Sequence, residues 1–201
     1  MKIFIAVVGK TCAGKETVYK TVQAMFHTRF KVSIHHFSDP LNENLDLLCL
    51  PKTRPNQQKL STVLREAFGE DILGNIIYQR ALSDTSEIVF LDGVRRPKDI
   101  AMLKKLSETS AFLIYIDAHI EKRFARLVKR SDRPGDAEKT WEDFQKEQAA
   151  EAESLIESLC QYADFEIDNS PDDPEFKSLK AQIMKFMREK VLMEKEARSG
   201  A

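Results

Sequence analysis

The sequence is poor in the residues that build disulfide frameworks and metal centres. Only three of its 201 residues are cysteines (Cys12, Cys49 and Cys160), and they are far apart and odd in number. This pattern argues against a disulfide scaffold or a cysteine-based zinc site and indicates reduced thiols in a reducing compartment. The four histidines show no metal-ligand spacing either, so we assign them no role.

Net charge and long apolar runs are also lacking. Lysine and arginine total 31 against 32 acidic residues, which gives a net charge of −1. A chain with this balance has no bulk field that would attract nucleic acid or an anionic membrane. No apolar run approaches the ~18 residues of a membrane span, and the short apolar N-terminus lacks a signal-peptide pattern. We therefore expect a cytoplasmic protein with neither nucleic acid nor membrane as partner.

The chain alternates between short apolar runs and amphipathic segments. Its apolar fraction of 42% and charged fraction of 31% suit a globular protein with one sizeable core. Strand–helix alternation predicts an α/β fold in which helices cover both faces of a five-stranded parallel sheet. No internal repeat or low-complexity linker interrupts it, so we expect a single domain over residues 1–201. The expected strands are 3–8, 31–37, 88–91, 112–116 and 165–167. One expected helix follows the first glycines, and another covers most of 54–80, with breaks near Gly69 and Gly74. The remaining expected helices are 97–106, 119–129, 140–162 and 176–187.

The stretch GKTCAGKE, residues 9–16, nearly satisfies the phosphate-loop pattern G-x-x-x-x-G-K-[ST]. In such a loop, backbone N–H groups and the helix dipole hold phosphate, and the lysine adds a point charge. The expected strand before it and helix after it are the context that the motif requires. The alternative is a glycine turn with an incidental lysine. The residues predicted to bind the nucleotide are Gly9, Lys10, Thr11, Cys12, Ala13, Gly14, Lys15, Glu16 and Thr17.

Glu16 stands where the motif has a hydroxyl residue that normally touches Mg²⁺. A carboxylate beside the phosphates would repel them. We therefore expect Glu16 to point away from the phosphates or to reach the metal only through water. Thr17 offers a hydroxyl one residue later.

Two further stretches carry charge next to expected strand ends. Asp92 ends the run IVFLD, where parallel sheets place their ligands, and suits Mg²⁺ binding through water. Arg95 and Arg96 follow and could clamp a phosphate, although a turn with two solvated arginines is the alternative. Farther on, spacings of three and four place Arg123, Arg126 and Arg130 on one helix face. A solvated basic helix is the alternative there.

These motifs together resemble nucleoside monophosphate kinases. The phosphate loop is similar to their G-x-x-G-x-G-K-G-T, and Glu16 to the acidic residue in the G-K-D of deoxynucleoside monophosphate kinases and animal-type phosphomevalonate kinases. The stretch DGVRR resembles the D-G-F-P-R of adenylate kinases, which makes Arg96 the acceptor arginine, or the D-V-R of deoxynucleotide kinases, which makes it Arg95. The D-G-x-R-x-P of residues 92–97 and the A-D-x-x-I-x-N of residues 163–169 resemble a P-loop kinase group akin to dephospho-coenzyme A kinases.

The resemblance implies a P-loop NTPase fold with an acceptor-binding insert at about 37–80 and a short lid at about 126–142. It also implies ATP and Mg²⁺ as cofactors, contact with the adenine near Asn169, and a small phosphorylated acceptor. That acceptor would be a nucleoside or deoxynucleoside monophosphate, with a dephospho-coenzyme A-like molecule as the alternative. The implied catalytic residues are Lys15, Arg96, Arg126, Arg130 and Arg133, and the implied acceptor-binding residues are Ser38, Asp39, Arg54, Arg65, Asp92, Arg95 and Arg96.

Two other functional classes also involve phosphate loops. A GTPase usually carries an Asn-Lys-x-Asp run after a strand, and this sequence lacks one; residues 168–171, DNSP, are a poor substitute. A non-catalytic nucleotide-binding regulator stays open, although Lys15 and the arginines favour catalysis.

Overall fold

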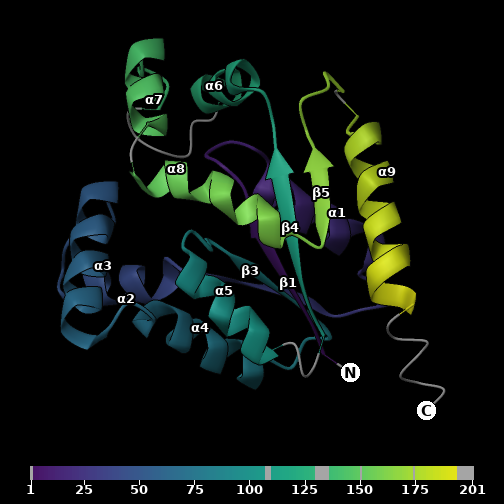
Figure 1. Cartoon of the computed structure of the whole chain (residues 1–201), viewed down its shortest axis with the longest axis horizontal. Coiled ribbons are helices and arrows are strands. Elements are labelled where there is room, and N and C mark those ends of the chain that lie inside the picture. The colour runs from purple at the N-terminus through teal and green to yellow at the C-terminus, as the bar shows by residue number, and fades with distance from the viewer. Residues whose placement is uncertain (1, 107–109, 130–135, 150, 174, 194–201) are drawn as a thin grey trace.

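The protein folds around one parallel β-sheet (Figure 1). The computed structural model describes residues 2–106, 110–129, 136–149, 151–173 and 175–193. Its five strands stand in the order β2-β3-β1-β4-β5, and each neighbouring pair is parallel. The predicted five-stranded parallel sheet is therefore confirmed. The strands are β1 (Ile3–Val8), β2 (Val32–His36), β3 (Ile88–Asp92), β4 (Ala111–Asp117) and β5 (Phe165–Asp168).

The central strand β1 shows why the sheet needs cover on both faces. All six of its residues are buried. Because successive side chains of a strand point to opposite faces, Ile3, Ile5 and Val7 enter one apolar cluster and the residues between them enter the other. The continuous apolar run is thus the signature of a strand with helices on both sides.

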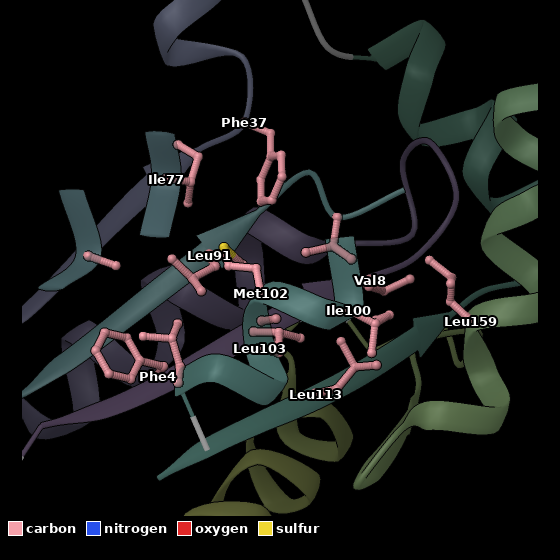
Figure 2. Packing of buried hydrophobic residues seen from close by; sticks show 14 of the residues in the cluster. Phe4, Val8, Phe37, Ile77, Leu91, Ile100, Met102, Leu103, Leu113 and Leu159 are labelled. Carbon is pink, nitrogen blue, oxygen red and sulfur yellow. The ribbon is translucent and has the colours of Figure 1, made fainter. Parts of the chain in front are cut away.

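One face is covered by α1 (Lys15–Phe26), α9 (Lys177–Phe186) and a π-helical segment, Met187–Leu192. The other face is covered mainly by α4 (Ile72–Ser83), α5 (Pro97–Leu106) and α8 (Glu151–Ser158). Figure 2 shows this second layer, in which Ile77 of α4 and Leu103 of α5 lie over the strands. The three layers hold the carboxyl ends of all five strands at one edge of the sheet.

The helices α2 (Asp39–Leu47), α3 (Arg54–Phe68) and α4 occupy most of residues 37–80, the region predicted to bind the acceptor. The sequence did not predict α2, whose only buried residues are Pro40, Leu41 and Leu45. The expected break at Gly69 is confirmed, since the chain has a positive φ of 100° there. The expected break at Gly74 is wrong: Gly74 is buried inside α4, where a side chain would meet Met102 of α5.

The chain after β4 forms α6 (Ile120–Lys129), α7 (Trp141–Gln148) and α8, followed by the 3₁₀ turn Leu159–Tyr162. Thr140 is the N-cap of α7, and its hydroxyl accepts a hydrogen bond from Asp143 N at 3.1 Å. The single helix expected after Thr140 is instead two helices and a turn. Within the described residues, no helix combines the length and apolarity needed to cross a membrane.

The packing of α9 on the sheet yields a stability prediction. Phe186 is fully buried and meets Phe112 of β4 edge to face and Phe165 of β5, with ring centroids 5.9 and 5.5 Å apart. Replacing Phe186 by Ala should lower the free energy of unfolding by about 3–5 kcal/mol, because the lost contacts leave a cavity. Urea denaturation measures this loss. The control Leu47→Ala, at a residue that is 82% exposed, should change stability by less than about 0.5 kcal/mol.

Candidate active site

Residues 9–14 form a tight loop that joins β1 to α1 at the carboxyl edge of the sheet. Gly14 has a φ of 112°, and a side chain there would collide with the amide of Asn169. At Gly9 a side chain would collide with the backbone oxygen of Ile116. Cys12 also has a positive φ, 62°. The loop therefore packs its backbone directly against the ends of β4 and β5, which only glycine permits at these two positions.

Lys15 begins α1 and turns its side chain back over this loop. Its Nζ donates hydrogen bonds to Gly9 O at 2.8 Å and to Lys10 O at 3.3 Å. The ammonium group thus lies beside the loop backbone at the positive end of the α1 dipole. This is the arrangement in which a phosphate can be held by backbone N–H groups and a lysine together.

Asn169 and Arg126 hold the loop from the other side. Asn169 Nδ2 donates to Ala13 O at 2.8 Å. The Arg126 guanidinium donates to Cys12 O and Ala13 O, both at 3.4 Å, and to Asn169 O at 2.6 Å. Burial lowers the pKa of Arg126, although nearby Cys12 and Asp172 oppose this change. Arg126, one of the predicted lid arginines, therefore contacts the predicted nucleotide-binding residues.

A cavity of about 450 Å³ opens beside Arg126 and Asn169. It lies between α6, the end of β5 and the start of α9. Phe176 supplies an aromatic ring, Lys122 and Lys129 supply positive charge, and Asp168, Asp172 and Asp173 supply negative charge. Its volume lies within the range of small-molecule sites.

Asp92 lies at the end of β3, where β3 pairs with β1 through the register Val7↔Asp92. Its Oδ2 accepts a hydrogen bond from His36 Nδ1 at 3.1 Å. Among the described residues, its Oδ1 is one of the buried side-chain atoms without a hydrogen-bond partner. Burial alone would raise the pKa of Asp92, but the hydrogen bond from His36 and the charge of Lys15 outweigh burial and lower it. Asp92 is therefore a carboxylate with one oxygen available to a water or a cation.

The residues predicted to bind the acceptor include two groups. In the first, Ser38 is the N-cap of α2, Asp39 Oδ2 accepts from His36 N at 2.8 Å, and Arg54 donates to Thr11 Oγ1 of the phosphate loop at 3.3 Å. Arg54 also pairs with Glu147 of α7 at 3.5 Å. This arginine thus joins the start of α3 to both the phosphate loop and α7.

The second group surrounds the corner between α3 and α4. Arg65 is 7% exposed, and its NH1 lies 3.7 Å from Glu70 Oε2. Arg96 NH1 donates to that same oxygen at 2.8 Å. The backbone N–H groups of Arg95 and Arg96 donate to Asp99 Oδ2 at 3.0 and 3.1 Å. Arg65 and Arg96, which are far apart in the sequence, are brought together around one carboxylate.

Glu16 points away from the loop, which is one of the two arrangements that the sequence allowed. Its side chain is mostly exposed and pairs with Lys20, one turn later in α1, at 2.7 Å. The predicted lid residues Arg130 and Arg133 lie outside the described residues. So do Pro134 and Gly135, which leaves α6 and α7 as the described ends of the predicted lid.

The described residues contain no group of three or more His, Cys, Asp or Glu side chains placed to hold a metal ion. The buried Oδ1 of Asp92 nevertheless fits the predicted role of holding Mg²⁺ through water. This role stays a prediction.

Several residues of the site carried no signal in the sequence. His36 was assigned no role, yet it contacts Asp92. Glu70 lies between two arginines, and Glu147 links Arg54 to Lys139, whose Nζ is 2.8 Å from its carboxylate. Arg123 did carry a signal, since its spacing placed it on one helix face with Arg126, and the structure shows it buried, donating to Ala118 O at 3.0 Å. Only the position of His36 next to Phe37-Ser38-Asp39, at a strand end, could have marked it.

Comparison with known proteins finds UPF0200 proteins as relatives in sequence and shikimate kinases as neighbours in structure. No protein-family model matches it. It is 26% identical over 177 residues to a UPF0200 protein of Hyperthermus butylicus, covering 88% of this chain and 90% of that one. It is 27% identical over 161 residues to a UPF0200 protein of Pyrococcus furiosus, covering 78% and 83%.

Solved structures show the same fold at low identity. A shikimate kinase from Bacteroides thetaiotaomicron matches with a TM-score of 0.59 and 12% identity, covering 96% of this chain and 98% of that one. A shikimate kinase from Acinetobacter baumannii in complex with shikimate matches with a TM-score of 0.55 and 14% identity, covering 96% of each chain. The chain therefore has the three-layer α/β/α fold of P-loop kinases, and the predicted fold class is confirmed.

The exposed position of Glu16 predicts that it is dispensable for nucleotide binding. In Glu16→Gly, the affinity for ATP should change by less than about threefold, because only a solvated i,i+4 pair is lost. Isothermal titration calorimetry with ATP and Mg²⁺ measures this. The comparison variant is Lys15→Ala, which should bind far more weakly. Equal losses in the two variants would contradict the orientation of Glu16 described above.

The pair His36–Asp92 predicts a pH dependence. The hydrogen bond to Asp92 raises the pKa of His36 above its usual value, with burial opposing and the negative charges of Asp92, Asp39 and Glu16 assisting. The stabilisation from this pair is therefore complete below about pH 6.5 and is lost as the pH rises through the raised pKa. NMR titration of the His36 ring should show a midpoint above about 6.5. Asp92→Asn should lower that midpoint, whereas Asp46→Asn, at an exposed ion pair with Lys52, should leave it unchanged.

Proposed function

We propose that this protein transfers a phosphoryl group from ATP to a small phosphorylated metabolite, with nucleoside and deoxynucleoside monophosphates as the acceptor class. One observation carries this proposal. The phosphate loop, Lys15 and Asp92 lie together where the neighbouring strands β1 and β3 end, with Asp92 opposite Val7 in the register. That edge of a parallel sheet is where α/β proteins bind their ligands.

On the donor side, the backbone of residues 9–15 and the Lys15 ammonium would hold the phosphates of ATP. The cavity beside Arg126, Asn169 and Phe176 would receive the base. Bound Mg²⁺ would neutralise phosphate charge and orient the terminal phosphate. Asp92 would support it through water, using the buried oxygen that His36 leaves available.

On the acceptor side, Ser38, Asp39 and Arg54 would line the insert of residues 37–80. Arg65, Arg95 and Arg96 would hold the anionic group of the acceptor, since guanidinium groups bind phosphate through paired N–H donors. Together with Arg126, the lid arginines Arg130 and Arg133 would stabilise charge on the transferring group. The structural neighbours include a shikimate kinase and a gluconokinase from Sinorhizobium meliloti (TM-score 0.50, 11% identity), and their names support a small molecule as acceptor in general.

The test is an ATP-consumption screen with wild type and Lys15→Ala. The acceptor panel contains nucleoside monophosphates, deoxynucleoside monophosphates and dephospho-coenzyme A. Wild type should form ADP only when the right acceptor is present, and Lys15→Ala should be slower by about 10²–10³-fold, because a charged contact to the phosphates is gone. The exposed Lys180→Ala is the control and should match wild type.

Two outcomes would redirect the proposal. Turnover with dephospho-coenzyme A alone would assign the acceptor to the class that residues 92–97 and 163–169 resemble. Tight ATP binding without turnover for any acceptor would favour a nucleotide-binding regulator.

A further inference from the structure

The carboxylate of Glu70 lies between Arg65 and Arg96, two of the arginines predicted to bind the acceptor. Its Oε2 lies 2.8 Å from Arg96 NH1 and 3.7 Å from Arg65 NH1. Glu70 belongs to the short corner between α3 and α4, directly after Gly69, and not to a helix. Its side chain can therefore turn away without unwinding either helix.

The deeper part of this cluster is fixed. Arg65 also donates to the backbone oxygen of Glu70, and its NH2 lies 3.8 Å from Asp99 Oδ1. Asp99 is 2% exposed, and its other oxygen accepts the two backbone N–H groups at the start of α5. By contrast, the side chains of Arg96 and Glu70 are 43% and 41% exposed. The pair of Arg96 and Glu70 is therefore the solvent-accessible part of the cluster.

The cluster has two arginines and two carboxyl groups, and burial raises the pKa of one of these, Asp99. Arg65 and Arg96 contribute two positive charges, and Glu70 and Asp99 are the two carboxyl groups beside them. A phosphate that approached Arg96 while Glu70 stayed in place would meet a like charge within a few ångströms, which is unfavourable. Anion binding at this arginine pair therefore requires the Glu70 side chain to leave.

We propose that Glu70 is an internal substitute for the anionic group of the acceptor: a phosphate monoester displaces its carboxylate from Arg96, and this exchange sets the acceptor affinity. Arg65 and Asp99 stay in place and align the incoming group. The identity of that group as the acceptor's phosphate rests on the proposed function. A carboxylate is the other chemical source of such an anion, and Glu70 itself shows that one fits.

A purely structural role for Glu70 leads to a different expectation. Half-exposed ion pairs contribute little to stability, so a contact that only joined the α3–α4 corner to the loop after β3 would have a small effect. Neutralising Glu70 would then weaken the fold slightly and leave anion binding unchanged. The two roles differ in how Glu70→Gln affects anion affinity.

The experiment follows the Nε–Hε NMR signals of the arginines in the full chain during titration with inorganic phosphate and, separately, acetate. Arg96→Ala and Arg65→Lys assign the two signals. Phosphate should shift the Arg96 signal, and Glu70→Gln should tighten the apparent Kd for phosphate by about 2- to 5-fold, the range of a solvent-exposed ion pair. The control Glu66→Gln removes an exposed charge from the same helix region and should behave as wild type.

Phosphate affinity in Glu70→Gln no tighter than in Glu66→Gln would overturn the proposal, as would an Arg96 signal that phosphate never moves. If Glu70→Gln increases the affinity for acetate more than the affinity for phosphate, the phosphate assignment is overturned and a carboxylate acceptor replaces it. ATP binding is read independently from the backbone amides of Gly9 and Gly14. A chain whose Arg96 responds as expected while those amides ignore ATP would refute the proposed function alone.

Discussion

The site depends on the close contact between the backbone of the phosphate loop and the ends of β4 and β5. No side chain separates Gly9 from the Ile116 carbonyl or Gly14 from the Asn169 amide. This contact fixes where α1 begins, and so places Lys15 over the loop and the positive end of the helix dipole toward the carboxyl edge of the sheet. It also brings the loop carbonyls within reach of Arg126, which comes from a helix more than a hundred residues later.

A second pattern unites four of the cations that the structure describes at this edge: each already has an oxygen partner within the chain. Lys15 and Arg126 donate to backbone carbonyls, Arg54 to Thr11 and Glu147, and Arg96 to Glu70. Buried or half-buried charges are costly without partners, so the fold supplies them. An anionic ligand at this edge would replace oxygen atoms of the chain with its own as partners of these cations. Its net affinity would therefore be the difference between the free energies of two similar sets of contacts.

Much of the fold could be predicted from the sequence. A strand buried on both faces of a parallel sheet has a continuous apolar run such as IFIAVV, and a helix has apolar residues that recur about every 3.6 residues. The loop was readable because its glycines and lysine stand at fixed spacing. The helix α2 was not, since its short polar sequence buries few residues. Gly74 was read as a break because local propensity disfavours glycine in helices, but packing against α5 outweighs that propensity. The contacts of His36 with Asp92 and of Glu70 with two arginines could not be predicted, because they join residues that only the tertiary fold brings together.

The strand register has a consequence for how insertions and deletions act on this protein. Asp92 stands beside Val7 of β1 and beside His36 of β2 because the three strands are aligned over their whole length. Removing one residue within β3 would shift every later position by about 3.3 Å and turn it to the opposite face. The same change would place the apolar residues of β3 in the wrong layers and carry Asp92 away from Lys15. A deletion in β3 would therefore disrupt the core and the candidate site together. The residues of β3 can be substituted, but their number cannot change.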